Sequence, residues 1–131
     1  MNGGIVIKES ANQKYTTDAF SRALFTGVCQ NVNVPVQSFA NRSDSVGGST
    51  LGNLSNTQVS IHAVDFGLAQ LAMHSCFETA GVKDTEYAII ALKEFYETNV
   101  QIDEAESVCL ESNCSKNREV GFDRCEKGID D

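Results

Sequence analysis

Gly4-Ile5-Val6-Ile7-Lys8 is the stretch from which the fold can be read, because its β-branched residues favour a buried strand. A second strand is predicted at Val34–Phe39, which contains the only proline of the chain. Between the two, apolar residues recur at helical spacing and predict a helix over residues 17–31. A strand, a helix and a strand in this order predict an α/β fold built in layers.

The next part of the chain continues the same alternation. The stretch Gly47–Gly52 is typical of a tight turn that opens a short helix. Apolar residues then alternate with Ser60 and His62, which predicts a third strand that begins at Val59 and ends near Asp65–Gly67. Thr16-Thr17-Asp18 is expected to cap the first main helix, and Asp84 to cap a second one.

The buried face of that second helix is predicted from helical spacing to consist of Tyr87, Ala88, Ala91, Leu92 and Phe95. Three short strands and two main helices make a thin sheet with few side chains to cover both faces. A chain of this size buries only a modest fraction of its surface. We therefore expect it to be a slice of a larger α/β domain, with a short mixed sheet and flanking helices.

Composition excludes several classes of protein. The 131 residues are 41% hydrophobic and 21% charged, which is ordinary for a globular chain. No apolar run approaches the roughly 18 residues that span a bilayer, and no signal peptide precedes the first strand. With 18 acidic and 10 basic residues the net charge is −8, which argues against nucleic acid as a partner. A cytoplasmic protein without membrane contact is the expectation.

The charge and the cysteines divide the chain in two. Residues 97–131 hold ten acidic and four basic residues, a net charge of −6, whereas residues 1–96 hold eight and six, a net charge of −2. We therefore predict a body over residues 1–98 and an acidic, cysteine-containing tail over residues 99–131. An odd count of five cysteines without an export signal favours reduced thiols. The x4 and x10 gaps between Cys109, Cys114 and Cys125 do not match paired C-x2-C zinc motifs.

His74 occupies the most site-like position, because it follows a strand that ends in a glycine-containing loop. A neutral imidazole there can bind zinc, although spacing alone favours a hydrogen-bonded, half-buried histidine. Glu78 is one helical turn away, but no H-E-x-x-H motif is present. His62 is expected at the surface without a role. For Lys8 and Tyr15, spacing alone predicts only a solvated lysine and a packed tyrosine.

Several stretches, taken in order, resemble the C-terminal part of the catalytic domain of the aspartyl aminopeptidase family. The members of this family are zinc-dependent exopeptidases, and the resemblance is greatest to the bacterial ones. Together they cover nearly all of residues 3–98. The stretches are Ile7–Tyr15, Val34–Gln37, Gly48–Gly52, Val64–Gly67, Gln70–Ser75 and Glu78–Gly81.

The resemblance implies a site with two zinc ions, or other divalent metals, in which His74 is a metal ligand. It implies that Lys8 and Tyr15 contact a peptide substrate, whose first residue is acidic. It also implies assembly of the full-length enzyme into a homo-oligomer, a dodecamer in the family. No catalytic residue is assigned, because the other ligands and the general base lie in upstream segments of the family. The chain alone is therefore predicted to be inactive.

Two departures from the family pattern are expected to loosen loops, because each replaces a frequent proline: Ala69 and Asn53. Two alternatives to the aminopeptidase fragment stay open at this point. One is a non-catalytic remnant of the same fold that binds a partner or serves assembly. The other is a thiol or metal-binding module formed by the tail cysteines.

Overall fold

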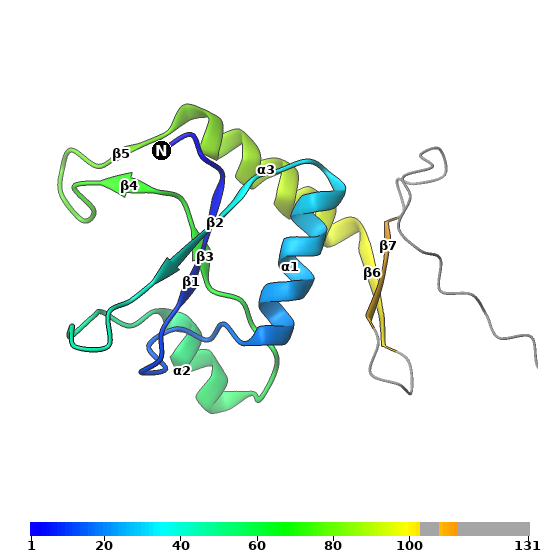
Figure 1. Ribbon diagram of the computed structural model, residues 1–131, viewed down its shortest axis with the longest axis horizontal. Coiled ribbons are helices and arrows are strands. Elements are labelled where there is room, and N and C mark those ends of the chain that lie inside the picture. The colour runs from blue at the N-terminus through cyan, green and yellow to red at the C-terminus, as the bar shows by residue number, and fades with distance from the viewer. Residues whose placement is uncertain (103–107, 113–131) are drawn as a thin grey trace, which may run out of the picture.

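The computed structural model describes residues 1–102 and 108–112, and its centre is a three-stranded mixed sheet (Figure 1). Strand β1 (Ile5–Glu9) lies between β2 (Val36–Ala40), which is parallel to it, and β3 (Phe66–Gly67), which is antiparallel. Helix α1 (Ala19–Asn31) connects β1 to β2. The predicted α/β class and the first two strands with their intervening helix are confirmed.

The remaining elements surround this sheet. Helix α2 (Leu51–Gln58) follows the glycine-rich turn, as predicted, and α3 (Val82–Glu97) contacts both α1 and β1. Two small antiparallel hairpins complete the described residues. The first pairs β4 (Gln70–Leu71) with β5 (Thr79–Ala80), and the second pairs β6 (Thr98–Ile102) with β7 (Val108–Ser112).

One small core joins the sheet to α1 and α3. Apolar side chains from β1, α1 and α3 meet there, and the ring of Phe25 stacks on that of Phe66 at a centroid distance of 4.6 Å. Of the predicted face of α3, Ala91 is fully buried and Tyr87 and Ala88 pack against the core. Phe95 is 40% exposed, so the end of that face is only partly covered. In the described residues, no helix is long and apolar enough to cross a membrane.

Only the end of the third predicted strand is confirmed, as β3, and its first part over residues 59–63 is wrong. Within the described residues these five pair with no strand, and the side chains of Val59 and Ile61 are 55% and 58% exposed. Side chains from the start of α1 hold the segment instead: the Ser21 hydroxyl donates to the Ala63 carbonyl at 3.0 Å. The chain joins the sheet only at β3, where Phe66 pairs with Ile7.

The role predicted for Asp84 is also wrong. Gly81 is the N-cap of α3, and Asp84 lies within the first turn, where it is fully buried. Its carboxylate accepts hydrogen bonds from the main-chain N–H groups of Asn2 at 2.6 Å and Gly4 at 2.9 Å. A negative charge is also favourable at this end of a helix. Asp84 therefore fastens the N-terminal segment to α3.

The cysteines have different surroundings. Cys29 is fully buried in the core, and burial raises the pKa of its thiol to about 11. Cys76 is exposed in the hairpin of β4 and β5. Cys109 lies on β7, where the hairpin contacts α1 and Leu110 approaches Gly27. The prediction of reduced thiols concerns, for Cys114 and Cys125, residues that lie outside the described part of the chain.

The cap of α1 gives a first testable prediction. Asp18 and Ser21 form a capping box, and the Asp18 carboxylate lies 2.6 Å from His62 Nδ1. Slight burial raises the pKa of Asp18, but hydrogen bonds from Ser21 and His62 and the charge of His62 outweigh it, so that the pKa is lowered. Asp18→Ala is expected to cost about 1 kcal/mol of stability at pH 7. Because the pKa is lowered on folding, this contribution is present above the ordinary pKa and lost as the pH falls below about 4.

Thermal unfolding of the parent and of Asp18→Ala at pH 7 and pH 3 measures this difference. The two midpoints should differ more at pH 7 than at pH 3. An equal difference at both pH values would contradict the assignment to the ionised carboxylate.

Candidate functional site

Lys8 and Tyr15, which are separated by a turn, are brought together in space. Lys8 lies on β1, and its Nζ is 5.5 Å from the centre of the Tyr15 ring. This distance is within the range of a cation–π interaction. The Lys8 side chain also passes Gly67, where an added Cβ would lie 3.7 Å from Lys8 Cε. Both side chains are partly buried, so Lys8 is not the fully solvated lysine that spacing alone predicted.

Asp65 connects the elements around Lys8. Its carbonyl accepts a hydrogen bond from the Lys8 N–H at 2.8 Å, and its own N–H donates to the Thr17 hydroxyl at 2.8 Å. Its carboxylate accepts a hydrogen bond from the hydroxyl of Thr50, the N-cap residue of α2. Sequence reasoning missed this connection, because Asp65 bonds to three segments that are distant from it along the chain.

An open groove with a volume of about 820 Å³ lies beside Lys8. Helix α2 with its glycine-rich turn forms one wall, and the segment of residues 61–66 forms the other. Leu51 and Leu54 on α2 are 80% and 65% exposed, so this wall presents apolar side chains together with the hydroxyl of Ser49. The groove is lined by one basic residue, Lys8, one acidic residue, Asp65, and an apolar wall, an arrangement that suits part of a peptide.

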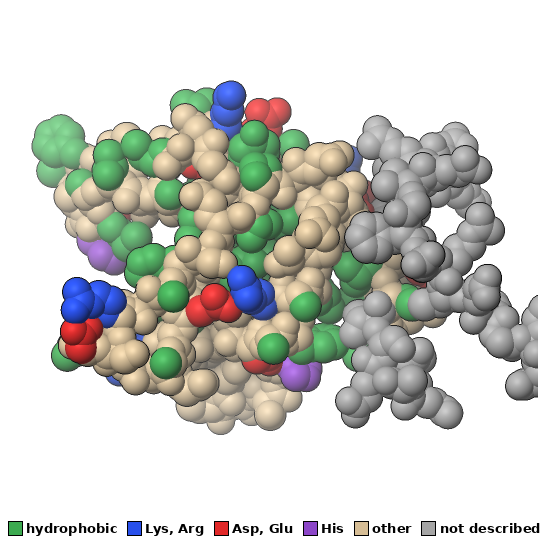
Figure 2. Space-filling model, in the orientation of Figure 1, with side chains coloured by type: hydrophobic (Ala, Val, Ile, Leu, Met, Phe, Trp, Pro, Cys, Tyr) green, Lys and Arg blue, Asp and Glu red, His purple; other side chains and the backbone are tan. Residues whose placement is uncertain are grey.

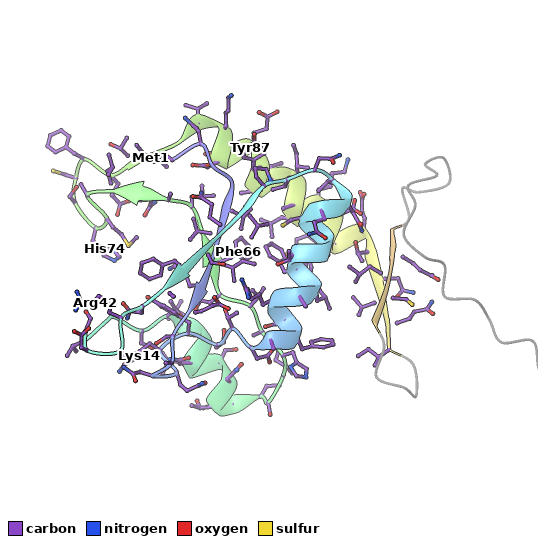
Figure 3. The ribbon with its side chains drawn as sticks, viewed as in Figure 1. Met1, Lys14, Arg42, Phe66, His74 and Tyr87 are labelled. Carbon is purple, nitrogen blue, oxygen red and sulfur yellow. The ribbon has the colours of Figure 1, made fainter. Side chains whose placement is uncertain are left out.

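His74 lies in the loop between β4 and β5 and is exposed (Figure 3). The half-buried position that spacing favoured is therefore wrong. The backbone here is constrained: Ala72 and His74 have φ of 52° and 69°, in the left-handed region. The His74 N–H donates to the Glu78 carboxylate, and the Ser75 N–H donates to the Ala72 carbonyl at 3.0 Å. Strained backbone of this kind clusters at functional sites.

The surface around His74 is apolar. Three large hydrophobic side chains of the same hairpin are exposed: Leu71, Met73 and Phe77. Figure 2 shows one face of the molecule on which hydrophobic side chains reach the surface near a histidine. Such a surface is typical of a segment that packs against further protein.

The described residues do not form a zinc site by themselves. They contain no group of three His, Cys, Asp or Glu side chains that could hold a metal ion. A catalytic zinc needs about three protein ligands, and His74 supplies one imidazole. The donor chemistry of His74 suits zinc, but the set of ligands within the described part of the chain does not.

The other histidine has a structural role. His62 is at the surface, as predicted, where it pairs with Asp18 and its ring lies 4.6 Å from that of Phe20. It thereby fastens the segment of residues 59–65 to the start of α1. Among the described residues, the His62 side chain makes no hydrogen bond or ring contact with Lys8 or His74.

Comparison with known proteins gives the family. The model of the M18 family, aminopeptidase I zinc metalloproteases, matches residues 1–96. "Probable M18 family aminopeptidase 2" of Clostridium novyi (strain NT) is 48% identical over 96 residues, which are 73% of this chain and 22% of that protein. "Aspartyl aminopeptidase 1" of Schizosaccharomyces pombe is 40% identical over 104 residues, which are 79% of this chain and 22% of that protein.

Solved structures agree with this fold. The cryo-EM structure of the Ape4 and Nbr1 complex matches with a TM-score of 0.71 at 43% identity, over 73% of this chain and 18% of that one. The crystal structure of prApe1 matches with a TM-score of 0.68 at 29% identity, over 72% of this chain and 20% of that one. The chain thus spans about a fifth of the length of the relatives it matches, and it belongs to the M18 family of aminopeptidase I zinc metalloproteases.

Proposed function

We propose that this chain provides one part of the active site of a zinc-dependent aminopeptidase that removes acidic N-terminal residues from peptides. The observation that carries the proposal is the Lys8 ammonium, which lies over the Tyr15 ring and beside an open groove. An ammonium in this position attracts a carboxylate of the peptide or the oxygen that becomes negative during hydrolysis. The Tyr15 ring limits where the ammonium can lie.

His74 is proposed to be a ligand of one of two zinc ions in the complete site, with its other ligands supplied from outside the described residues. Zinc at such a site supplies a water molecule that is acidic enough to act as a nucleophile near neutral pH. The exposed imidazole and the constrained loop of Ala72 and His74 support this role. With one ligand, the chain alone is expected to be inactive.

The same family supports three broader proposals. The body over residues 1–98 acts as a segment of the catalytic domain, and residues 99–131 form an acidic extension whose described strand β7 contacts α1. The complete enzyme is a homo-oligomer. The protein is proposed to be cytoplasmic, because the odd cysteine count favours reduced thiols.

A chimeric enzyme tests the proposed function. Residues 1–96 replace the matching segment of the Clostridium novyi aminopeptidase, to which they are 48% identical. We expect the chimera to hydrolyse aspartyl-p-nitroanilide and Lys8→Met to lower its kcat/KM by about 100-fold, the typical effect of one lost electrostatic contact in a transition state. The purified 131-residue chain should not hydrolyse the substrate at all.

Lys14→Met is the matched control, because Lys14 is in the same loop and its ammonium contacts no acidic or aromatic partner that the structure describes. This variant should retain the activity of the chimera. Equal activities for Lys8→Met and Lys14→Met would contradict the role of Lys8. Activity of the isolated chain would contradict the need for outside ligands.

A further inference from the structure

The loop that carries Tyr15 is fastened to the first turn of α2. The side-chain amide nitrogen of Asn53 lies 3.1 Å from the Gln13 carbonyl and 2.9 Å from the Lys14 carbonyl. The same nitrogen lies 2.9 Å from the Ser49 hydroxyl oxygen, and that hydroxyl also reaches the Lys14 carbonyl at 3.4 Å. The two carbonyls that precede Tyr15 are therefore held by one side chain.

The other side of Tyr15 is held by packing. A Cβ added to Gly52 would lie 2.7 Å from Thr16 Cγ2, so the helix backbone and Thr16 approach closely. Gln13 itself has a φ of 55°, and its N–H closes a turn onto the Ser10 carbonyl at 3.1 Å. A residue in this left-handed conformation costs free energy, which the surrounding contacts must offset. Tyr15 thus lies between two anchored neighbours.

We propose that Asn53 is a positioning residue for Tyr15, and through the Tyr15 ring for the Lys8 ammonium. This inference rests on the proposed function, in which these two side chains contact the peptide. The replacement of proline at position 53 was expected to loosen the loop. The hydrogen bonds of Asn53 do the opposite, because they give the loop donors that proline lacks.

Tyrosine fluorescence tests the proposal in the 131-residue chain without any substrate. The chain has no tryptophan and three tyrosines, so Tyr87→Phe and Tyr96→Phe leave Tyr15 as the single emitter. In this background, Asn53→Asp keeps the size of the side chain but removes both amide donors. Asn53 is the third residue of α2, where an acid favours the helix, so this variant separates loop positioning from helix stability.

In Asn53→Asp, we expect acrylamide to reach the Tyr15 ring more easily. The quenching constant of the Tyr15 fluorescence should rise toward its value in the urea-unfolded chain, and the fluorescence anisotropy should fall. Asn53→Pro should behave alike, because proline is tolerated in the first turn but donates no hydrogen bond. The matched control is Gln58→Glu, an amide-to-acid change on the same helix, which should keep the parent values. Circular dichroism of each variant confirms that the chain is folded.

Unchanged quenching and anisotropy in both folded Asn53 variants would overturn the proposal. So would an equal change in Gln58→Glu, because the effect would then come from charge on α2. The proposed function is tested separately in the chimera, where Lys8→Met lowers activity and Lys14→Met does not. A failure there leaves the fluorescence result intact, and a failure of the fluorescence result leaves the roles of Lys8 and Tyr15 intact.

Discussion

Replacing Asp84 by alanine is expected to remove about 3 kcal/mol from the free energy of unfolding, because two hydrogen bonds to a carboxylate are lost and each contributes about 1.5–3 kcal/mol. Asp84 is fully buried, and its carboxylate accepts the N–H groups of Asn2 and Gly4. Without it, the buried N–H of Gly4 loses its acceptor, whereas the N–H of Asn2 lies nearer the surface. Domains are stable by only about 5–15 kcal/mol, so this loss is a large fraction of the total.

Urea denaturation of Asp84→Ala and Asp84→Asn measures this cost. Asparagine keeps one oxygen acceptor and should lose less stability than alanine. The control is Asp44→Ala, because Asp44 is exposed and pairs only with Arg42 among the described residues. This surface pair should contribute no more than about 1 kcal/mol. Equal losses of stability for the Asp84 and Asp44 variants would contradict the role of Asp84 in fastening the N-terminal segment to α3.

Replacing His74 by alanine in the chimeric enzyme is expected to lower zinc affinity by at least about 100-fold. Mutation of a residue that merely orients a ligand already costs 10–100-fold, so loss of a ligand costs more. Zinc content after dialysis against a chelator, with hydrolysis of aspartyl-p-nitroanilide, measures the effect. Because the imidazole is exposed and makes no contact in the core, the fold of the chimera should be unaffected.

His62→Ala is the matched control for this experiment, since it removes the other histidine of the chain. It should retain zinc and activity, with only the small loss of stability expected of an exposed pair with Asp18. If His74→Ala kept its zinc, or if both variants lost it equally, His74 would not be the ligand.

Elements whose signals are local could be predicted from the sequence. The β-branched run at Ile5–Ile7 and the helical spacing after Asp18 each specify a structure from neighbouring residues alone. The segment of residues 59–63 shows the limit of such reasoning. Its alternation fits a strand, but a strand also needs a partner. Here the Ser21 hydroxyl on α1 donates a hydrogen bond to Ala63 instead.

The candidate site could be predicted only in part. His74, Lys8 and Tyr15 were identified through the resemblance to a family, and the contact between Lys8 and Tyr15 needed the structure. Asp65 and Asn53 were missed because their partners lie on distant segments, and no local pattern encodes such contacts. For Asp84, an acid near the start of a helix is a common cap, and only the fold revealed its buried partners.

The hydrogen bonds between Asp84 and the N-terminal segment also have a consequence for the order in which the chain can fold during synthesis. The unit of β1, α1 and β2 is complete once residue 40 has been made, so its parallel pair can form early. Gly4 and Asp84, however, are 80 positions apart. At about 5–20 residues per second, the ribosome takes several seconds to cover that distance. During this interval the N–H groups of Asn2 and Gly4 are without their carboxylate acceptor, and a chain that stalls before residue 84 cannot form this contact.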